Sequence, residues 1–302
     1  MPIYVEILIR ADIDYLWHYT QTPDIHECWD LRFSRIEYLP RTDDSQPQQF
    51  LYSTMIGFGM TIRGKGESVG SREEKTGCRT SALKFWSDDP RSLIQTGSGY
   101  WQYIPTPDGI RFLTRYNYDT RFGMLGRVCD RAVFRRLLGW ATAWSFDRLR
   151  LWLEKGIEPA ISLERSVVHC LVRVSLAVIW IYQGLVPKLL FHNVAELRML
   201  QRVRILHGVE PTVLNIVGIV EVVFGCLLML RWDSRKLLVL NILLLVVLGV
   251  AAFISQPLMF VAPFNPFTLN LAMIVLSIAG LVSAHDLPTA KSCRRAPPGN
   301  PT

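Results

Sequence analysis

The sequence predicts two domains of different class, an α+β domain with a curved antiparallel sheet around a long helix, followed by an all-α bundle of four transmembrane helices. Up to residue 160 the chain alternates between apolar and polar positions and carries 21 Lys and Arg against 20 Asp and Glu. The later residues form long apolar runs, with 12 basic and 6 acidic residues at their edges. This charge pattern is typical of a membrane protein and does not indicate a nucleic-acid-binding surface.

The composition and the chain's beginning set the expected boundaries and compartment. We expect the first domain at 1–156, the membrane domain at 162–287 and a disordered tail at 288–302. The first residues, Met1–Asp14, have no basic region before their short apolar run, so they do not resemble a signal peptide. The six cysteines are scattered singly, without CxxC or zinc spacing, which indicates a reducing compartment and no metal site.

The elements of the first domain follow in order from local signals. A β-rich stretch at 4–9 comes first, and Asp12 is a good N-cap for a helix that reaches Tyr19. Pro23 begins a second short helix that ends near Asp30. Alternating segments bounded by turn residues then predict strands, and a helical pattern follows. The expected strands are 33–39, 49–56, 60–69, 79–86, 93–104 and 110–118, and the long helix is 125–155.

This order of elements, with Trp29 and Asp30 in the second short helix, resembles the helix-grip fold of the START-like superfamily, also called SRPBCC. The resemblance implies a sheet wrapped around the long helix and a deep cavity for a small hydrophobic ligand, such as a lipid or a quinone-like molecule. The alternative is that the aromatic side chains fill a core. The aromatic candidates for the cavity wall are Trp17, Trp29, Trp86, Trp101, Tyr103 and Tyr116.

Some members of that superfamily are cyclases or hydrolases, and catalysis in the cavity would need polar groups that point inward. The nearest candidates, Asp30, His26, Arg115 and Asn117, have no recognisable dyad or triad spacing. We expect His26 at the surface and Arg115 on the solvent face of its strand. No catalytic residue and no cofactor is predicted, and an enzyme is the less favoured hypothesis.

The long helix is rich in basic residues. Two interpretations stay open: a solvated face with ion pairs, or a contact with the anionic inner leaflet of the membrane. The basic residues are Arg127, Arg131, Arg135, Arg136, Arg148, Arg150 and Lys155, against Asp130, Asp147 and Glu154.

Four apolar segments are long enough to cross a bilayer. They are expected at 167–187, 211–230, 237–255 and 266–284. The basic connection RWDSRK and the basic tail predict both termini on the inner side of the membrane. Four basic residues disagree with this topology, because they lie on the side of the membrane that is expected to be outside. They are Lys188, Arg198, Arg202 and Arg204, and we interpret 194–207 as an amphipathic helix on the membrane surface.

Glu221 lies in the middle of the second span, where an unpaired charge costs about 2.5 kcal/mol or more. A helix rise of about 1.5 Å per residue places Arg173 at a similar depth, so we predict that these two residues pair and that Asn241 joins them. Lys188 directly follows the first span and is counted with the intramembrane polar residues. Gln183, Asn215 and Asn270 form a second polar layer, and Gly184, Gly218 and Gly225 allow close helix approach. The polar layers either fix the helix register or bind a headgroup, a quinone or protons.

The membrane half resembles the DoxX-like family of small four-helix membrane proteins. The residues that carry this resemblance are Arg173, Tyr182-Gln183-Gly184 and Pro187-Lys188 in the first span, with Asn215, Gly218, Glu221 and Gly225 in the second. The family includes subunits associated with thiosulfate:quinone oxidoreduction and with membrane redox assemblies. No redox cofactor ligand is evident in this sequence, since it has neither a Cys pair nor facing histidines.

The leading hypothesis is a binding module of the membrane. Its cytoplasmic cavity would take a small hydrophobic ligand, a lipid or quinone-like molecule, and present it to the bundle, since a short tether keeps the two domains together. The alternatives are a subunit of a quinone-linked redox complex with a membrane redox partner, and a scaffold subunit without its own activity. The expected partners are therefore the lipid bilayer and the ligand, and no nucleic acid.

Overall fold

The computed structural model describes residues 2–41, 43, 46–57, 59–201, 208–263 and 265–298. The chain forms two compact units. Unit 1 contains the residues up to Ser162 together with those from Pro288 onward, and unit 2 contains Leu163–Leu287.

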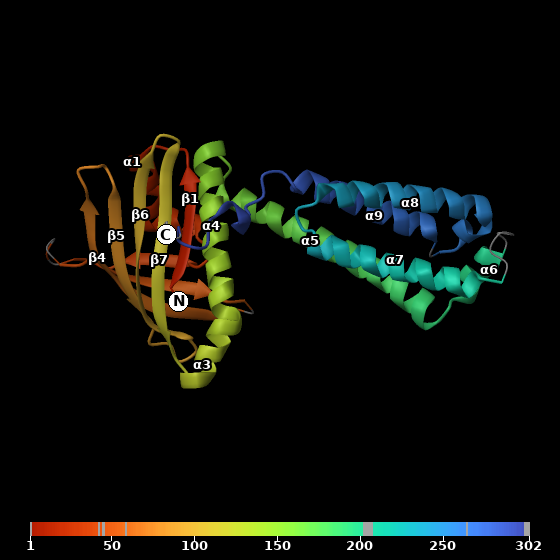
Figure 1. Ribbon diagram of the computed structural model, residues 1–302, viewed down its shortest axis with the longest axis horizontal. Coiled ribbons are helices and arrows are strands. Elements are labelled where there is room, and N and C mark those ends of the chain that lie inside the picture. The colour runs from red at the N-terminus through yellow and green to blue at the C-terminus, as the bar shows by residue number, and fades with distance from the viewer. Residues whose placement is uncertain are drawn as a thin grey trace. The chain divides into compact units, whose positions relative to one another are not determined.

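Unit 1 is built on an antiparallel sheet of seven strands, in the order β1-β7-β6-β5-β4-β3-β2 (Figure 1). β2 to β7 are joined in sequence as hairpins, whereas β1 crosses to pair with β7, with Ile3 opposite Tyr116 and Ile9 opposite Ile110. The strands are β1 Ile3–Ile9, β2 Arg35–Tyr38, β3 Gln49–Met55, β4 Thr61–Glu73, β5 Arg79–Trp86, β6 Ile94–Thr106 and β7 Gly109–Thr120. The antiparallel sheet predicted from the alternation is therefore confirmed.

Two short helices, α1 Ile13–Gln21 and α2 Pro23–Trp29, connect β1 to β2. The Asp12 side chain accepts hydrogen bonds from the first turn of α1, and Pro23 occupies the first turn of α2, as the sequence predicts. After β7 the chain forms α3 Gly123–Cys129, a π-helical turn η1 Asp130–Phe134 and α4 Arg135–Lys155. The long helix expected at 125–155 is thus divided by a π turn.

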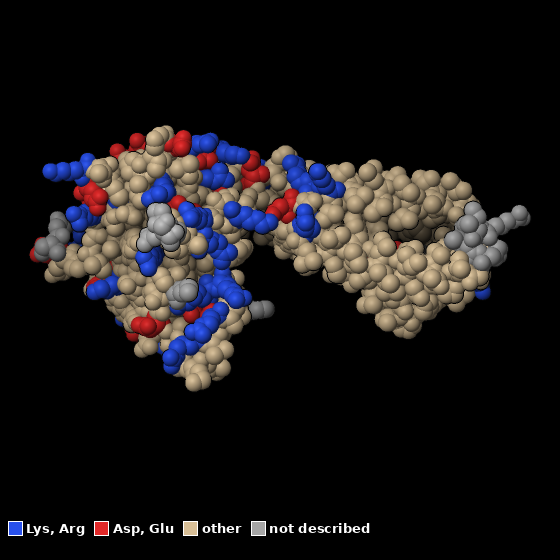
Figure 2. Space-filling model, viewed as in Figure 1, with Lys and Arg blue, Asp and Glu red and all other residues tan. Residues whose placement is uncertain are grey.

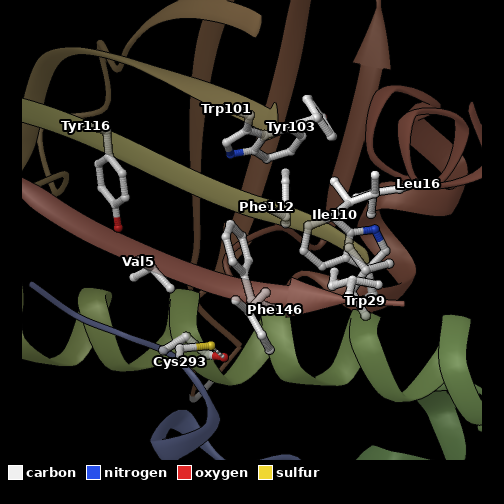
Figure 3. Close-up of a cluster of buried hydrophobic side chains, with 14 of the residues drawn as sticks. Val5, Leu16, Trp29, Trp101, Tyr103, Ile110, Phe112, Tyr116, Phe146 and Cys293 are labelled. Atoms are coloured by element: carbon white, nitrogen blue, oxygen red, sulfur yellow. Dashed lines mark hydrogen bonds between the residues drawn. The ribbon is translucent and has the colours of Figure 1, made fainter. Parts of the chain in front are cut away.

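The core of unit 1 lies between the sheet and α4 (Figure 3). The ring of Phe112 on β7 stacks on that of Phe146 on α4, with centroids 4.4 Å apart. Val5 and Leu16 belong to the same cluster and are fully buried. Burial of each such side chain contributes about 1.5–3 kcal/mol to the free energy of folding. This packing stabilises the long helix against the curved sheet and gives the helix-grip arrangement.

The expectation of a disordered tail at 288–302 is wrong for the described residues up to 298. Arg294 exchanges two backbone hydrogen bonds with Glu6 of β1, at 2.9 and 2.8 Å. Cys293 is buried, and its thiol donates to the carbonyl of Ala143 on α4. β1 is an edge strand with unpaired backbone groups, so the tail finds partners there that its basic composition does not reveal.

Unit 2 is helical. Its elements are the remainder of α5 Pro159–Gln183, the π turn η2 Gly184–Leu190, α6 Val194–Gln201, α7 Glu210–Leu230, α8 Arg235–Ser255, the short η4 Pro257–Val261 and α9 Pro266–Ser283. Four helices are long and apolar enough to cross a membrane: Pro159–Leu190, Glu210–Leu230, Arg235–Ser255 and Pro266–Ser283. Of the surface helix expected at 194–207, α6 covers the first part, and residues 202–207, with Arg202 and Arg204, lie outside the described residues.

Glycines bring α5, η2 and α7 into backbone contact. A Cβ on Gly218 would lie 2.9 Å from the Gly184 carbonyl oxygen and from Lys188 Cβ, and a Cβ on Gly225 would lie 2.8 Å from the Ala177 carbonyl oxygen. The close approach predicted from these small residues is confirmed. It also fixes the register of the two helices, with Gly184 opposite Gly218.

Candidate functional site

A largely buried ion pair lies at the end of α2 in unit 1. Asp30 follows Trp29 as the C-cap of α2, and its side chain is fully buried. Arg32 donates to both of its carboxylate oxygens, from Nε to Oδ1 at 2.9 Å and from Nη2 to Oδ2 at 2.6 Å. His26, one turn earlier on α2, lies with Nε2 3.0 Å from Oδ2. The carboxylate is therefore held by two side chains at once.

Electrostatics keep this pair ionised at neutral pH. Burial by itself would raise the pKa of Asp30, but the Arg32 guanidinium and the hydrogen bonds from Arg32 and His26 outweigh it and hold that pKa well below its usual range. Burial opposes the charge on Arg32 as well, and the Asp30 carboxylate raises the Arg32 pKa in spite of it.

Aromatic rings and a tyrosine hydroxyl surround the ion pair. The His26 ring stacks on Trp29 with centroids 4.9 Å apart and meets the edge of Trp101 at 5.0 Å. The Arg32 guanidinium lies 5.7 Å from the centroid of the Tyr116 ring, and the Tyr116 hydroxyl lies 2.8 Å from Thr142 Oγ1 on α4. Buried ion pairs seldom improve stability over apolar packing, so this cluster is a candidate site for function.

The expected surface position of His26 is wrong, because its side chain is only 12% exposed and points at Asp30. His26 and Asp30 are four residues apart and so share a helix face, which is the signal that could have predicted their contact. Arg32 was not among the residues expected at this site. Arg115 is exposed as expected, and Asn117 is exposed and accepts from Arg135 at 3.0 Å. The structure thus joins His26 to Asp30 and leaves Arg115 and Asn117 apart from them.

The predicted cavity residues lie in two settings. Trp29, Trp101, Tyr103 and Tyr116 are buried in the core of unit 1 (Figure 3), while Trp17 and Trp86 are partly exposed. Centroid distances of 5.0 Å for Trp17–Tyr103 and 6.1 Å for Trp29–Trp101 show that rings contact one another. Side chains fill the interior at these positions.

A second polar cluster lies in unit 2, and it provides the partner of Glu221. The carboxylate pairs with Lys188 at 2.9 Å, and Lys188 also pairs with Glu196 of α6 at 3.2 Å. Lys188 lies in η2, whose π turn contains Pro187. We call Lys188, Glu196 and Glu221 the membrane-unit cluster. Figure 2 shows the surface of unit 2 hollowed towards the end that carries α6, with acidic atoms visible inside.

The predicted pair of Arg173 with Glu221 is wrong. Arg173 is fully buried and donates to two backbone carbonyls, to Leu228 at 3.3 Å and to Ser234 at 2.6 Å. Since Gly184 lies opposite Gly218, Arg173 lies opposite Leu228, which is seven residues or about 10 Å of helix from Glu221. The depth estimate began the first span at 167, whereas its helix begins at Pro159.

The other intramembrane polar residues also find local partners. Asn241 accepts from Trp180 Nε1 at 2.6 Å and donates to Ser277 Oγ at 2.8 Å, so it links α5, α8 and α9 and does not join Glu221. Asn270 donates to the Leu245 carbonyl at 3.1 Å, which ties α9 to α8. Asn215 lies 2.9 Å from His192, and the backbone carbonyl of Gln183, not its side chain, accepts from Lys188. The expected amide layer is therefore split among separate contacts.

Among the described residues, no group of three or more His, Cys, Asp or Glu side chains is arranged to hold a metal ion.

Comparison with known proteins assigns the chain to a family. Residues 177–278 match the model of the DoxX-like family. The protein named "Uncharacterized membrane protein YndG" of Bacillus subtilis (strain 168) is 45% identical over 225 residues, covering 70% of this chain and 82% of YndG. This chain belongs to the YndG family. It is a membrane protein, and its unit 2 is DoxX-like.

Solved structures resemble unit 1 at low similarity. A STAR-related lipid transfer protein from Xanthomonas axonopodis is 16% identical, covers 50% of this chain and 84% of its own, and has a TM-score of 0.38. The di-domain ARO/CYC StfQ from the steffimycin biosynthetic pathway is 19% identical, covers 52% of each chain and has a TM-score of 0.41. The helix-grip arrangement of this chain is visible in its own strand order and in the packing of α4 against the sheet.

Proposed function

We propose that this protein is a multi-pass protein of the bacterial cell membrane, whose unit 1 binds a small hydrophobic ligand with a polar group and presents it to the membrane unit. A lipid or a quinone-like molecule has this chemistry. The observation that carries the proposal is the buried Asp30–Arg32–His26 cluster enclosed by aromatic rings. An aromatic wall with a few fixed polar groups is the usual composition of a small-molecule site.

The polar group of the ligand would bind beside the ion pair, where the Tyr116 hydroxyl and the Arg32 guanidinium meet. The apolar part would replace rings that now contact each other. Phe33 and Tyr52 are suited to move, since Tyr52 is only partly buried and its hydroxyl makes a long 3.5 Å hydrogen bond to the Trp86 carbonyl. Binding would therefore select a conformation in which these rings have rotated.

Chain connectivity and the distribution of charge together support a cytoplasmic unit 1. Both ends of the segment 163–287 continue into unit 1, so the number of membrane crossings between them must be even, and four spans satisfy this. The basic connection 231–236 falls after the second span, on the side of unit 1, which agrees with the positive-inside rule. Lys188, one of the four basic residues that disagreed with that rule, is paired with two glutamates.

Mass spectrometry of the full chain purified in mild detergent tests the proposal. We expect a co-purifying lipid or quinone, and after delipidation we expect saturable binding of a quinone and a fatty acid, followed by tryptophan fluorescence. Tyr116→Phe keeps the ring and removes the hydroxyl, and should weaken binding about tenfold. Tyr38→Phe, at an exposed ring on β2, is the matched control. A delipidated chain that binds neither probe would refute the proposal.

A second candidate function is favoured by the membrane-unit cluster. Lys188 and Glu221 would bind the polar head of a quinone within the membrane, as a subunit of a redox complex does, with the lysine as donor and the carboxylate as acceptor. The same titration separates the two candidates. Loss of quinone binding in Glu221→Gln, with normal binding in Tyr116→Phe, would favour the membrane site.

A further inference from the structure

An exposed apolar stripe runs along the outer side of α3, η1 and the first turns of α4. Its side chains are large and far more exposed than core residues of unit 1, with Met124 at 78%, Leu125 at 77% and Val133 at 61%. The other members are Val128, Leu137 and Trp140. A water-facing helix would normally carry polar residues at such positions.

The π turn keeps the stripe on one side of the helix. The exposed positions advance by four from Met124 to Val128, by five to Val133 and by four to Leu137. In an α-helix a step of five would move the side chain to another face, but a π turn contains one more residue and returns it to nearly the same face. The extra residue turns Asp130 inward, where it accepts from Tyr118 at 2.6 Å and from Arg135 at 2.8 Å.

Basic residues accompany the stripe, and exposed acids do not. Arg127, Arg131 and Arg136 are exposed along it, and Figure 2 shows basic side chains gathered over α3 and α4. The only acid between residues 120 and 146 is Asp130, which is buried and bonded. The tail adds Arg295, whose Nη2 lies 3.5 Å from the Arg136 carbonyl.

We propose that this stripe, with its arginines, docks on the surface of an anionic lipid bilayer. Apolar side chains on one helical face flanked by arginines are the composition of interfacial membrane helices, and anionic headgroups complement the charge. The chain itself keeps a bilayer near, because the membrane-crossing α5 begins nineteen residues after Trp140. The tether gives the stripe a high effective concentration of lipid, so a moderate intrinsic affinity suffices.

Cys129 is a natural reporter for this contact. It is exposed and lies next to Val128 in the stripe, whereas Cys28, also exposed, lies on α2. The full chain is placed in nanodiscs that contain either phosphatidylcholine alone or phosphatidylcholine with phosphatidylglycerol. A charged, membrane-impermeant maleimide is then added, and peptide mass spectrometry follows each cysteine separately.

We expect alkylation of Cys129 to be about tenfold slower in the discs with phosphatidylglycerol, to recover at high salt, and the rate of Cys28 to stay unchanged. Leu125→Asp with Val133→Asp should restore the rate, while Val69→Asp, at an exposed apolar position of β4, should not. Equal Cys129 rates in the two lipid compositions would overturn the proposal. Protection found only in native membranes would also overturn it and would assign the face to a protein partner.

Discussion

Two arginines, one in each unit, are stabilised in different ways. Arg32 of unit 1 is paired with a carboxylate, that of Asp30. Arg173 of unit 2 donates to backbone carbonyls, one of which belongs to Leu228 in the last turn of α7. That turn has carbonyls without helical partners and carries the negative end of the helix dipole, so it can accept hydrogen bonds from a cation.

The difference shows two ways of compensating a charge that is removed from water. The Arg32 site uses a charge pair inside an aromatic shell, which makes the Asp30 carboxylate indispensable. The buried Arg148 of the same unit instead donates to the Pro159 carbonyl, at 3.0 and 2.6 Å. The Arg173 site of unit 2 uses backbone carbonyls, one of them at a helix end. The mid-span carboxylate of Glu221 pairs with Lys188 instead. Loss of a single partner should therefore cost more at the Arg32 site than at the Arg173 site.

The largest effect is expected from Asp30→Asn, which leaves Arg32 and His26 buried without their anion. We expect the free energy of unfolding of unit 1 to fall by about 3 kcal/mol or more. Asp88→Asn removes the partner of Lys65 from an exposed pair and should cost less than about 0.5 kcal/mol. Denaturant unfolding followed by tryptophan fluorescence measures both, and equal losses would contradict the role given to Asp30.

The same pair predicts a pH dependence. Because the folded state depresses the pKa of Asp30, its contribution is present above the unfolded-chain value of about 3.9 and is lost as pH falls below it. Unfolding measured between pH 3 and 7 should show the wild type losing stability at the acid end. Asp30→Asn should show a smaller acid-end loss, and an unchanged acid profile would sink this account.

In unit 2 the helix contact is expected to matter next most. Gly225→Ala places a methyl group against Ile181 and the Ala177 carbonyl, and should destabilise the bundle by about 1–3 kcal/mol. Gly249→Ala meets only the end of the Asn270 side chain, at 3.1 Å, and serves as the control. Unfolding in mixed micelles compares the two variants, and equal tolerance would argue against close packing of α5 on α7.

The smallest effect is a coupling energy. A double-mutant cycle of Lys188→Met with Glu221→Gln should give a coupling of about 1 kcal/mol, because the two side chains form an ion pair. The cycle of Arg173→Gln with Glu221→Gln should give less than about 0.5 kcal/mol, because the two have no shared partner. A larger coupling in the second cycle than in the first would identify Arg173, the residue expected from depth alone, as the partner of Glu221.

The sequence predicts elements well where one segment carries its own signal. Alternation located the strands, Asp12 and Pro23 marked two helix starts, and apolar length located four spans. Partners were harder to predict, because they depend on register between segments. Arg173 faces Leu228 only because the glycine contacts set α5 against α7 at that height. His26 points inward because α2 turns that face to Trp101, which is distant in the chain.

The tail's return to β1 has a consequence for biosynthesis. Arg294 completes the edge of the first strand, yet it leaves the ribosome more than 130 residues after the end of α4 at Lys155. At about 5–20 residues per second, this delay is on the order of ten seconds. During that time the edge of β1 in the nascent domain lacks its partner while the four spans enter the bilayer. We therefore expect the Glu6–Arg294 bridge to form only after membrane insertion is complete.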